Sequence, residues 1–335
     1  MELALLASAF LIGGLLAVQA SVNLQLNKAV GTPYGASTVQ LTVATVLLAL
    51  AAVAVGALGA FGNLTDVEPW HLLGGLASPL YITSGILLFP RIGALAAVGL
   101  FVTGQMFASL ALDLFGLIGV ARQSMTAGIA VGAVAVLAGI TIVIRGAKQA
   151  TVATPAPVPA TVGAGGGGGT SAPAPPPAPT SHGVGRAGWI LLGLVAGAVL
   201  PIQGAVNARL RADLNEPLAV ALISFVVATV TIAIVLLVLR ALGRTPAPKL
   251  GELGKVPWWG WLGGACAAVY VTATFLLIPE IGAATTIALT VTGQQVASAL
   301  IDHFGLFRMP RRPMNTNRLA GLALLIAGSL LIQLL

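Results

Sequence analysis

The sequence predicts an all-α integral membrane protein with ten transmembrane helices, arranged as two inverted five-helix repeats. Its composition, its ten long apolar windows and an internal repeat carry this prediction. Hydrophobic residues make up 57% of the 335 residues and charged residues only 7%, whereas globular chains carry about 25% charged residues. This chain has too few charged groups to cover the surface of a water-soluble domain of its size.

Ten windows are long and apolar enough to span a bilayer, whose core of about 30 Å needs roughly 20 residues of helix. The first window carries Glu2 in place of the basic residues that begin a signal peptide, so we interpret it as a helix. The windows are residues 3–25, 36–60, 70–89, 92–114, 125–144, 187–208, 217–240, 258–278, 281–301 and 317–335.

The second half of the chain repeats the first. At an offset of 189 residues, 23 of the 48 positions from 70 to 117 are identical. The repeated features are Gly-Gly, a tyrosine, Pro-x-Ile-Gly-Ala, Thr-Gly-Gln and Asp-x-Phe-Gly, and upstream the repeat continues at an offset of 184. Gene duplication is the simplest account of so close a match.

Each half contains five windows, and an odd number of spans makes the second half enter the membrane from the opposite face. We therefore predict a first repeat over residues 1–150 and an inverted second repeat over residues 186–335. Residues 151–185 between them are rich in Pro, Gly, Ala, Ser and Thr, a composition typical of a flexible linker.

The basic residues predict the orientation. With the N-terminus outside, 13 of the 16 Lys and Arg residues fall on the cytoplasmic face, and only Arg122, Arg209 and Arg211 fall on the other. Both termini are then outside the cytoplasm and the linker is cytoplasmic. These basic loops face lipid headgroups, and we expect no nucleic-acid partner.

Polar side chains inside the spans occur at equivalent positions in both halves. Such groups are costly in hydrocarbon and should face the bundle interior or a water-filled path. The residues predicted to line a substrate path are Gln19, Asn23, Tyr81, Gln105, Ser109, Gln203, Asn207, Tyr270, Gln294 and Ser298. The alternative is that these amides and hydroxyls only join helices, each contributing about 1 kcal/mol or less.

Two aspartates, Asp113 and Asp302, lie at equivalent positions near the ends of the fourth and ninth windows. Because the halves are inverted, Asp113 should lie toward the outer face and Asp302 toward the inner face. We predict a gating or proton-linked role for both carboxylates. The alternative is that each reaches interfacial water or bonds a loop amide.

No enzymatic chemistry is predicted. The three histidines have no second ligand at metal-binding spacing, and the sequence contains no nucleophile-base set and no cofactor fingerprint. The single cysteine, Cys266, lies in an apolar window and cannot form an intramolecular disulfide. We expect no metal and no cofactor.

The repeated motifs resemble the bacterial YdcZ-like branch of the drug/metabolite transporter superfamily, in its fused ten-helix form. The resemblance implies small-molecule transport across the inner membrane, without a settled substrate. The related small multidrug resistance transporters use a glutamate in the middle of the first helix, where this chain has Gln19 and Asn23. That departure argues against drug-cation antiport.

The sequence therefore favours a secondary transporter of a small polar or cationic metabolite that works by alternating access, with proton coupling as a further expectation. A passive channel or small-ion pore is the alternative, and a membrane scaffold without transport is a third. Because both orientations are fused in one chain, a functional monomer is expected, without excluding a homodimer.

Overall fold

The computed structural model describes residues 2–152 and 185–334, and within them the chain forms ten α-helices and no strand. The first repeat contains α1 (Glu2–Val30), α2 (Pro33–Ala54), α3 (Ser78–Ile92), α4 (Ala94–Phe115) and α5 (Ala127–Val152). The second contains α6 (Arg186–Leu214), α7 (Pro217–Ala241), α8 (Leu262–Ile281), α9 (Ala283–Phe304) and α10 (Thr316–Leu334).

The predicted windows match the helices with a few shifts. The third window is divided, because a 3₁₀ segment, η2 (Pro69–Ala77), precedes α3 and Pro79 stands in the first turn of α3. α5 continues to Val152, into the predicted linker. The rest of that linker, residues 153–184, lies outside the described residues.

In the described part of the chain, nine helical segments are long and apolar enough to cross a bilayer. α9 is not among them, although it is 22 residues long. Its sequence carries four threonines and two adjacent glutamines, Gln294 and Gln295, which lower its apolar character. The predicted membrane fold is confirmed, but the count of ten spans is not.

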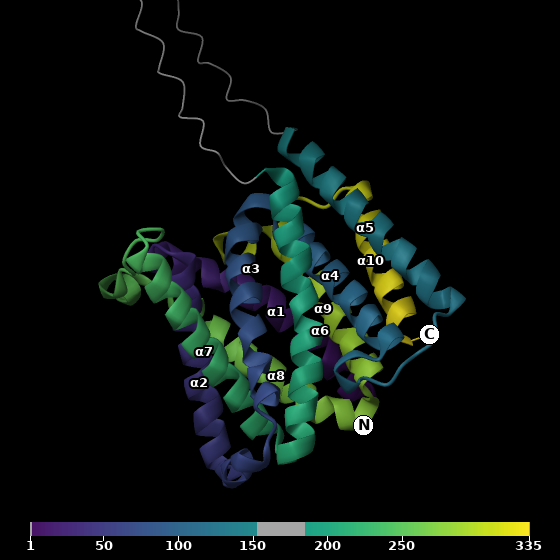
Figure 1. The fold of residues 1–335 in the computed structure, drawn as a ribbon. Coiled ribbons are helices and arrows are strands. Elements are labelled where there is room, and N and C mark those ends of the chain that lie inside the picture. The colour runs from purple at the N-terminus through teal and green to yellow at the C-terminus, as the bar shows by residue number, and fades with distance from the viewer. Residues whose placement is uncertain (1, 153–184, 335) are drawn as a thin grey trace, which may run out of the picture.

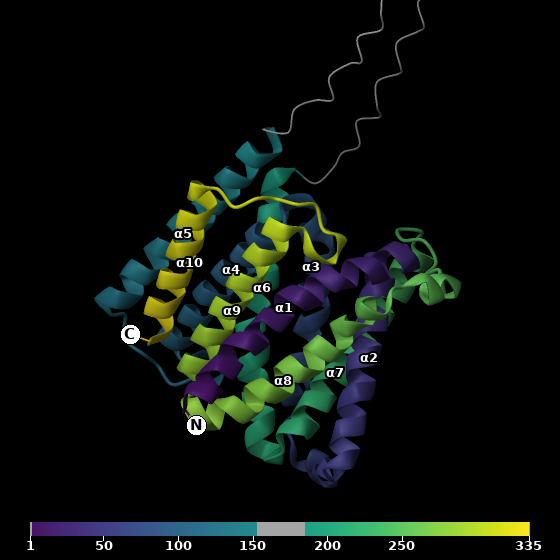
Figure 2. The ribbon, with the colours of Figure 1, turned by 180° about the vertical axis from the view of Figure 1, so that it is seen from behind.

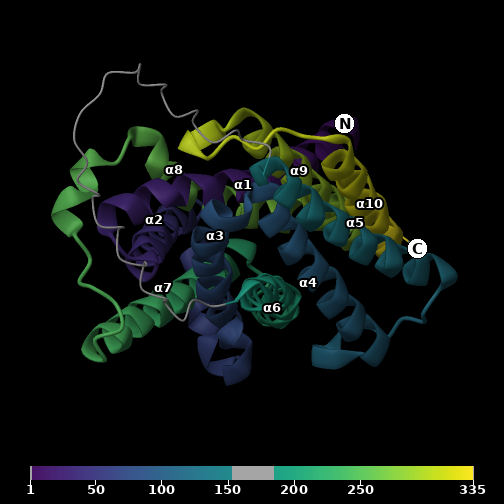
Figure 3. The same ribbon diagram turned by 90° about the horizontal axis from the view of Figure 1, so that it is seen from above.

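The two repeats are interleaved. α1 packs chiefly against α8 and α9 of the second repeat, and α6 packs chiefly against η2, α3 and α4 of the first. The equivalent helices α2 and α7 pack against each other, as do α5 and α10. Viewed from above, α5 and α10 lie together on one side of the molecule, and α2 and α7 lie on the opposite side (Figure 3).

Glycines show that the repeats are antiparallel. Gly132 of α5 meets Gly328 of α10, and Gly139 meets Gly321, so one helix runs up as the other runs down. At an offset of 189, Gly132 is equivalent to Gly321 and Gly139 to Gly328. Each helix thus presents the same glycine pair to its partner in reverse, as an inverted repeat requires.

Both chain termini lie at one end of the bundle, and α5 finishes and α6 begins at the other (Figures 1 and 2). We call these the terminal end and the linker end. The α3–α4 turn lies at the linker end, and its counterpart, the α8–α9 turn, lies at the terminal end.

Glycine also permits the close crossings between the repeats. A Cβ added at Gly197 of α6 would collide with the backbone of Phe101 in α4, and one at Gly13 of α1 would collide with Thr290 in α9. In lipid there is no hydrophobic driving force between helices, so their association depends on close van der Waals packing, which small residues such as glycine permit.

We expect Gly197→Ala to destabilise the protein by about 1–3 kcal/mol, because the added methyl overpacks a helix crossing. Gly204→Ala, two turns further along α6, is the matched control, since nothing lies within 4 Å of its Cβ position. It should be neutral or slightly stabilising. Thermal unfolding in detergent micelles measures both, and equal melting temperatures for the two variants would contradict the crossing.

Candidate functional site

The interior of the bundle carries a polar set drawn from both repeats. Tyr81 of α3 accepts a hydrogen bond from the Gln294 amide of α9, with 2.7 Å between the oxygen and the nitrogen, and both side chains are buried. Tyr81 and Gln294, which the sequence selects in different repeats, are therefore brought into direct contact. Tyr270 of α8 is partly buried.

The asparagines make a different kind of contact. The Asn23 side-chain oxygen lies against Gly263, and the Asn207 oxygen lies against Gly74, its counterpart in the other repeat. Neither oxygen has a hydrogen-bond partner within the described chain, whereas the Asn207 amide nitrogen donates to Ser224. These contacts favour helix packing as the role of Asn23 and Asn207.

Some of the remaining predicted residues form side-chain hydrogen bonds within the protein, and others have a buried polar atom without a partner. Gln203 exchanges hydrogen bonds with Ser78 at 2.9–3.1 Å, and Ser298 donates to Gln295 of its own helix. The Gln19 side-chain oxygen is buried without a partner among the described residues. Gln105 is buried and Ser109 partly buried.

Asp302 closes the linker end of the bundle. The backbone N–H groups of Ala94 and Leu95, the first residues of α4, donate to its two carboxylate oxygens at 2.7 and 3.2 Å. Arg318 of α10 forms an ion pair with the same carboxylate, and neither side chain is exposed. A negative charge at a helix N-terminus is stabilised by the helix dipole, so a residue of the second repeat caps a helix of the first.

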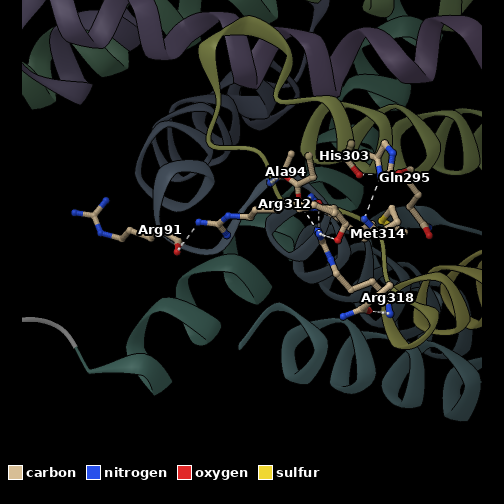
Figure 4. A network of polar contacts seen from close by, with 12 residues as sticks. Arg91, Ala94, Gln295, His303, Arg312, Met314 and Arg318 are labelled. Atoms are coloured by element: carbon tan, nitrogen blue, oxygen red, sulfur yellow. Dashed lines mark hydrogen bonds and ion pairs between the residues drawn. The ribbon is translucent and has the colours of Figure 1, made fainter. Parts of the chain in front are cut away.

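The loop before α10 completes this closure. Arg318 donates to the carbonyls of Arg312 and Pro313, and Arg312 reaches across to the carbonyls of Pro90 and Arg91 in the α3–α4 turn (Figure 4). Burial lowers the pKa of the Arg312 guanidinium, while the charge of Asp302 opposes that shift. We call Asp302, Arg312, Arg318 and the start of α4 the linker-end closure.

Sequence reasoning missed part of this closure. The distribution of basic residues predicts Arg318 as one of the cytoplasmic residues that set topology, yet it lies in the first turn of α10 and is fully buried. Gln40 and Gln295 are also buried polar groups that the repeat comparison did not select. One difference between the two repeats points to Arg318: the equivalent position in the first repeat is the apolar Ile129.

The terminal end lacks the equivalent closure. The Asp113 carboxylate has no hydrogen-bond or ion-pair partner among the described residues, and its expected partners, Ala283 and Ala284 at the start of α9, are exposed. A Cβ at Gly93 would come within 2.8 Å of Asp302, whereas nothing lies within 4 Å of the position at Gly282. The α3–α4 turn is docked and the α8–α9 turn is not.

Two further equivalent contacts differ in the same way. The Tyr81–Gln294 hydrogen bond is present, but no counterpart joins Tyr270 and Gln105 in the described structure. Ala20 of α1 packs against Gly85 of α3, while its counterpart Gly204 of α6 faces open space. The contacts that hold α3 and the α3–α4 turn at the linker end therefore have no counterparts beside α6 and the α8–α9 turn in the described structure.

The loops around the two aspartates are nevertheless alike. The backbone oxygen of Asp113 accepts from Gln123, and that of Asp302 accepts from the equivalent Arg312. Ile118 and Phe307, also equivalent, both have a positive φ, 54° and 56°. The asymmetry therefore lies in how the helix turns dock and not in the loops that hold the aspartates.

No metal centre is built within the described ranges, where no group of three or more His, Cys, Asp or Glu side chains is suited to hold an ion. His71 instead pairs with Asp213, 2.5 Å from Nδ1 to Oδ2.

The fold and the polar interior define the class of a membrane transporter built from inverted repeats. The family described as "Putative inner membrane exporter, YdcZ", of the drug/metabolite transporter superfamily, matches residues 4–142 and 188–331. The chain belongs to this family, and each repeat matches it separately, as the resemblance implied.

A solved crystal structure covers 97% of this chain and 96% of its own, with a TM-score of 0.54 at 18% sequence identity. At that identity the likeness shows the fold alone. Among curated proteins, none is significantly similar in sequence to this chain.

We expect Arg318→Leu to cost about 3–5 kcal/mol, because it leaves the buried Asp302 carboxylate without its counter-ion. The double variant Asp302→Leu with Arg318→Leu should recover part of that loss, since no unpaired charge remains. Thermal unfolding of the single and double variants provides the measurement. A double variant less stable than Arg318→Leu alone would contradict the assignment.

Gly93→Ala and Gly282→Ala form a matched pair. Both glycines combine a positive φ, 89° and 82°, with an extended ψ, 164° and 155°, a conformation essentially confined to glycine. Both substitutions therefore carry a similar backbone strain of about 1–3 kcal/mol. Only the methyl at Gly93 also collides with the closure. Gly93→Ala should therefore melt at a lower temperature than Gly282→Ala, and equal melting temperatures would show that the α3–α4 turn is not tightly docked.

Proposed function

We propose that the protein is a secondary active transporter that moves a small polar or cationic compound across the inner membrane by alternating access. The observation that carries this proposal is the difference between the two ends. Contacts related by the pseudo-twofold are made at the linker end and open at the terminal end. An inverted repeat can exchange these two arrangements, because each is available to either half.

The direction follows from the basic residues. Their distribution assigns the linker end to the cytoplasm, so the described arrangement is outward-open in this proposal. The α8–α9 turn would dock as the α3–α4 turn opens, and the open end would then face the cytoplasm. The protein imports or exports according to which of these steps carries the substrate. Membership of the exporter family favours export.

The substrate would be held by amide and phenol groups near the centre. Tyr81, Gln294, Tyr270 and Gln105 come from both repeats and would line the path in this proposal. Unpaired side-chain oxygens, such as that of Gln19, accept hydrogen bonds from a ligand that carries N–H or O–H donors. This chemistry favours a small polar or cationic compound over an anion.

The two aspartates would couple this exchange to protons. Asp302 is paired with Arg318 in the linker-end closure, and Asp113 is unpaired at the open end. Alternate binding and release of a proton at such a carboxylate is a common coupling device in transporters. The functional unit would be one chain, because the interleaved repeats complete each other, with membrane lipids as its surroundings.

A passive channel is the second candidate, and the linker-end closure disfavours it. A channel keeps a continuous polar path, whereas here a fully buried ion pair and a capped helix join the two repeats at one end. A scaffold without transport would use every polar contact as packing. The close glycine contacts of Asn23 and Asn207 fit that role. A scaffold, however, does not require the two ends of the bundle to differ.

The first test is binding. Thermal stabilisation of the purified protein by amines, amino acids, nucleosides and guanidinium compounds, at two pH values, should identify a ligand class. The double variant Gln105→Leu with Gln294→Leu should lose that stabilisation. Gln295→Leu is the matched control, because it removes a neighbouring buried amide that bonds Ser329 and not Tyr81. A shift that survives in the double variant would place the site elsewhere.

The second test is counterflow in proteoliposomes loaded with the ligand so identified. A transporter accelerates exchange of labelled for unlabelled ligand across the membrane, and a channel dissipates the gradient without exchange. Exchange that depends on a pH gradient would support proton coupling. Conductance without exchange would replace the transporter proposal with the channel.

A further inference from the structure

The asymmetry between Asp302 and Asp113 assigns each a specific partner, and this inference rests on the proposed alternating access. Asp302 receives the N–H groups of Ala94 and Leu95. At an offset of 189, the equivalent residues of the second repeat are Ala283 and Ala284, the first two residues of α9. Asp113 is the residue equivalent to Asp302.

The surroundings of Asp113 are built for the same contact. Its loop has the backbone bonds of the Asp302 loop, including that from Gln123 to its carbonyl, and the Arg122 guanidinium donates to Leu114 as that of Arg311 donates to His303. The α9 N-terminus starts at Gly282 with almost the same φ as Gly93, 82° against 89°. The Asp113 loop and the N-terminus of α9 therefore already have the backbone conformations of their counterparts, the Asp302 loop and the N-terminus of α4.

We propose that Asp113 is the outer gating residue, and that its carboxylate caps the N-terminus of α9 through the N–H groups of Ala283 and Ala284 when the terminal end closes. Capping of α9 by Asp113 then alternates with capping of α4 by Asp302. In each state one repeat lends an aspartate to the start of a helix in the other, and the free aspartate faces the open end.

The two caps are unequal. Asp302 also holds Arg318, whereas the residue equivalent to Arg318 is Ile129. The linker-end closure therefore has one more charge-assisted contact than the terminal closure can have, and such contacts are roughly twice as strong as neutral ones. The outward-open arrangement is accordingly the resting one, and removing Arg318 should bring the two states closer in population.

The experiment measures both ends in one membrane. Spin labels at Glu280 and Leu117, both exposed, report the terminal end; labels at their equivalents, Arg91 and Leu306, also exposed, report the linker end. Each pair of cysteines is placed in a Cys266→Ala background, and distances are measured by pulsed electron resonance in lipid nanodiscs. The unmodified gates should give a long terminal distance and a short linker distance.

Arg318→Leu should add a short terminal distance and a long linker distance. Adding Asp113→Leu to Arg318→Leu should remove the short terminal distance, because the α9 cap is lost. Asp113→Asn, which keeps one acceptor oxygen, should restore part of it. If Arg318→Leu does not accumulate, Asp302→Asn weakens the same closure at nearly constant side-chain volume, and the same comparison applies.

The outcomes distinguish a failure of the proposed α9 cap from a failure of the proposed alternating access. A short terminal distance that persists undiminished with Asp113→Leu overturns the capping role and leaves alternating access standing. If neither Arg318→Leu nor Asp302→Asn changes the distances at either end, both alternating access and the cap that rests on it are overturned. Loss of the short distance in Asp113→Leu, with partial return in Asp113→Asn, supports the proposal.

Discussion

The buried contact between Asp302, Arg318 and the N-terminus of α4 is the constraint on which this structure depends. It joins three elements from both repeats, α9, α10 and α4, and places an ion pair with no exposed side-chain surface at one end of a membrane protein. Such a pair is tolerated only where further hydrogen bonds satisfy it. The N–H groups of Ala94 and Leu95 and the loop carbonyls before α10 supply them.

That closure also explains why two similar halves are packed differently. With the α3–α4 turn held by Asp302, α3 packs close to α1, and Tyr81 can reach Gln294. The α8–α9 turn has no such anchor in this arrangement, so the first residues of α9 are exposed and Gly204 of α6 has no neighbour.

The close glycine crossings hold helices of opposite repeats against each other. Gly13 and Gly197 let α1 and α6 lie against helices of the opposite repeat, and Gly132 and Gly139 do the same for α5 against α10. Backbones in close contact can pivot about a crossing without repacking large side chains. In the proposed cycle the crossings stay and the helix turns move.

The sequence by itself determined the membrane class, the two repeats, their inversion and the family, because apolar length, odd span number and repeated motifs are properties of the chain alone. It also selected Tyr81, Gln294 and Asp302, since equivalent polar residues in apolar helices stand out. Only the tertiary structure decided which of two equivalent contacts is made. That choice depends on Arg318 meeting Asp302 across a loop and on the docking of a helix turn. The chain contains the difference between Arg318 and Ile129, but its effect exists only once folding brings Arg318 against the Asp302 carboxylate.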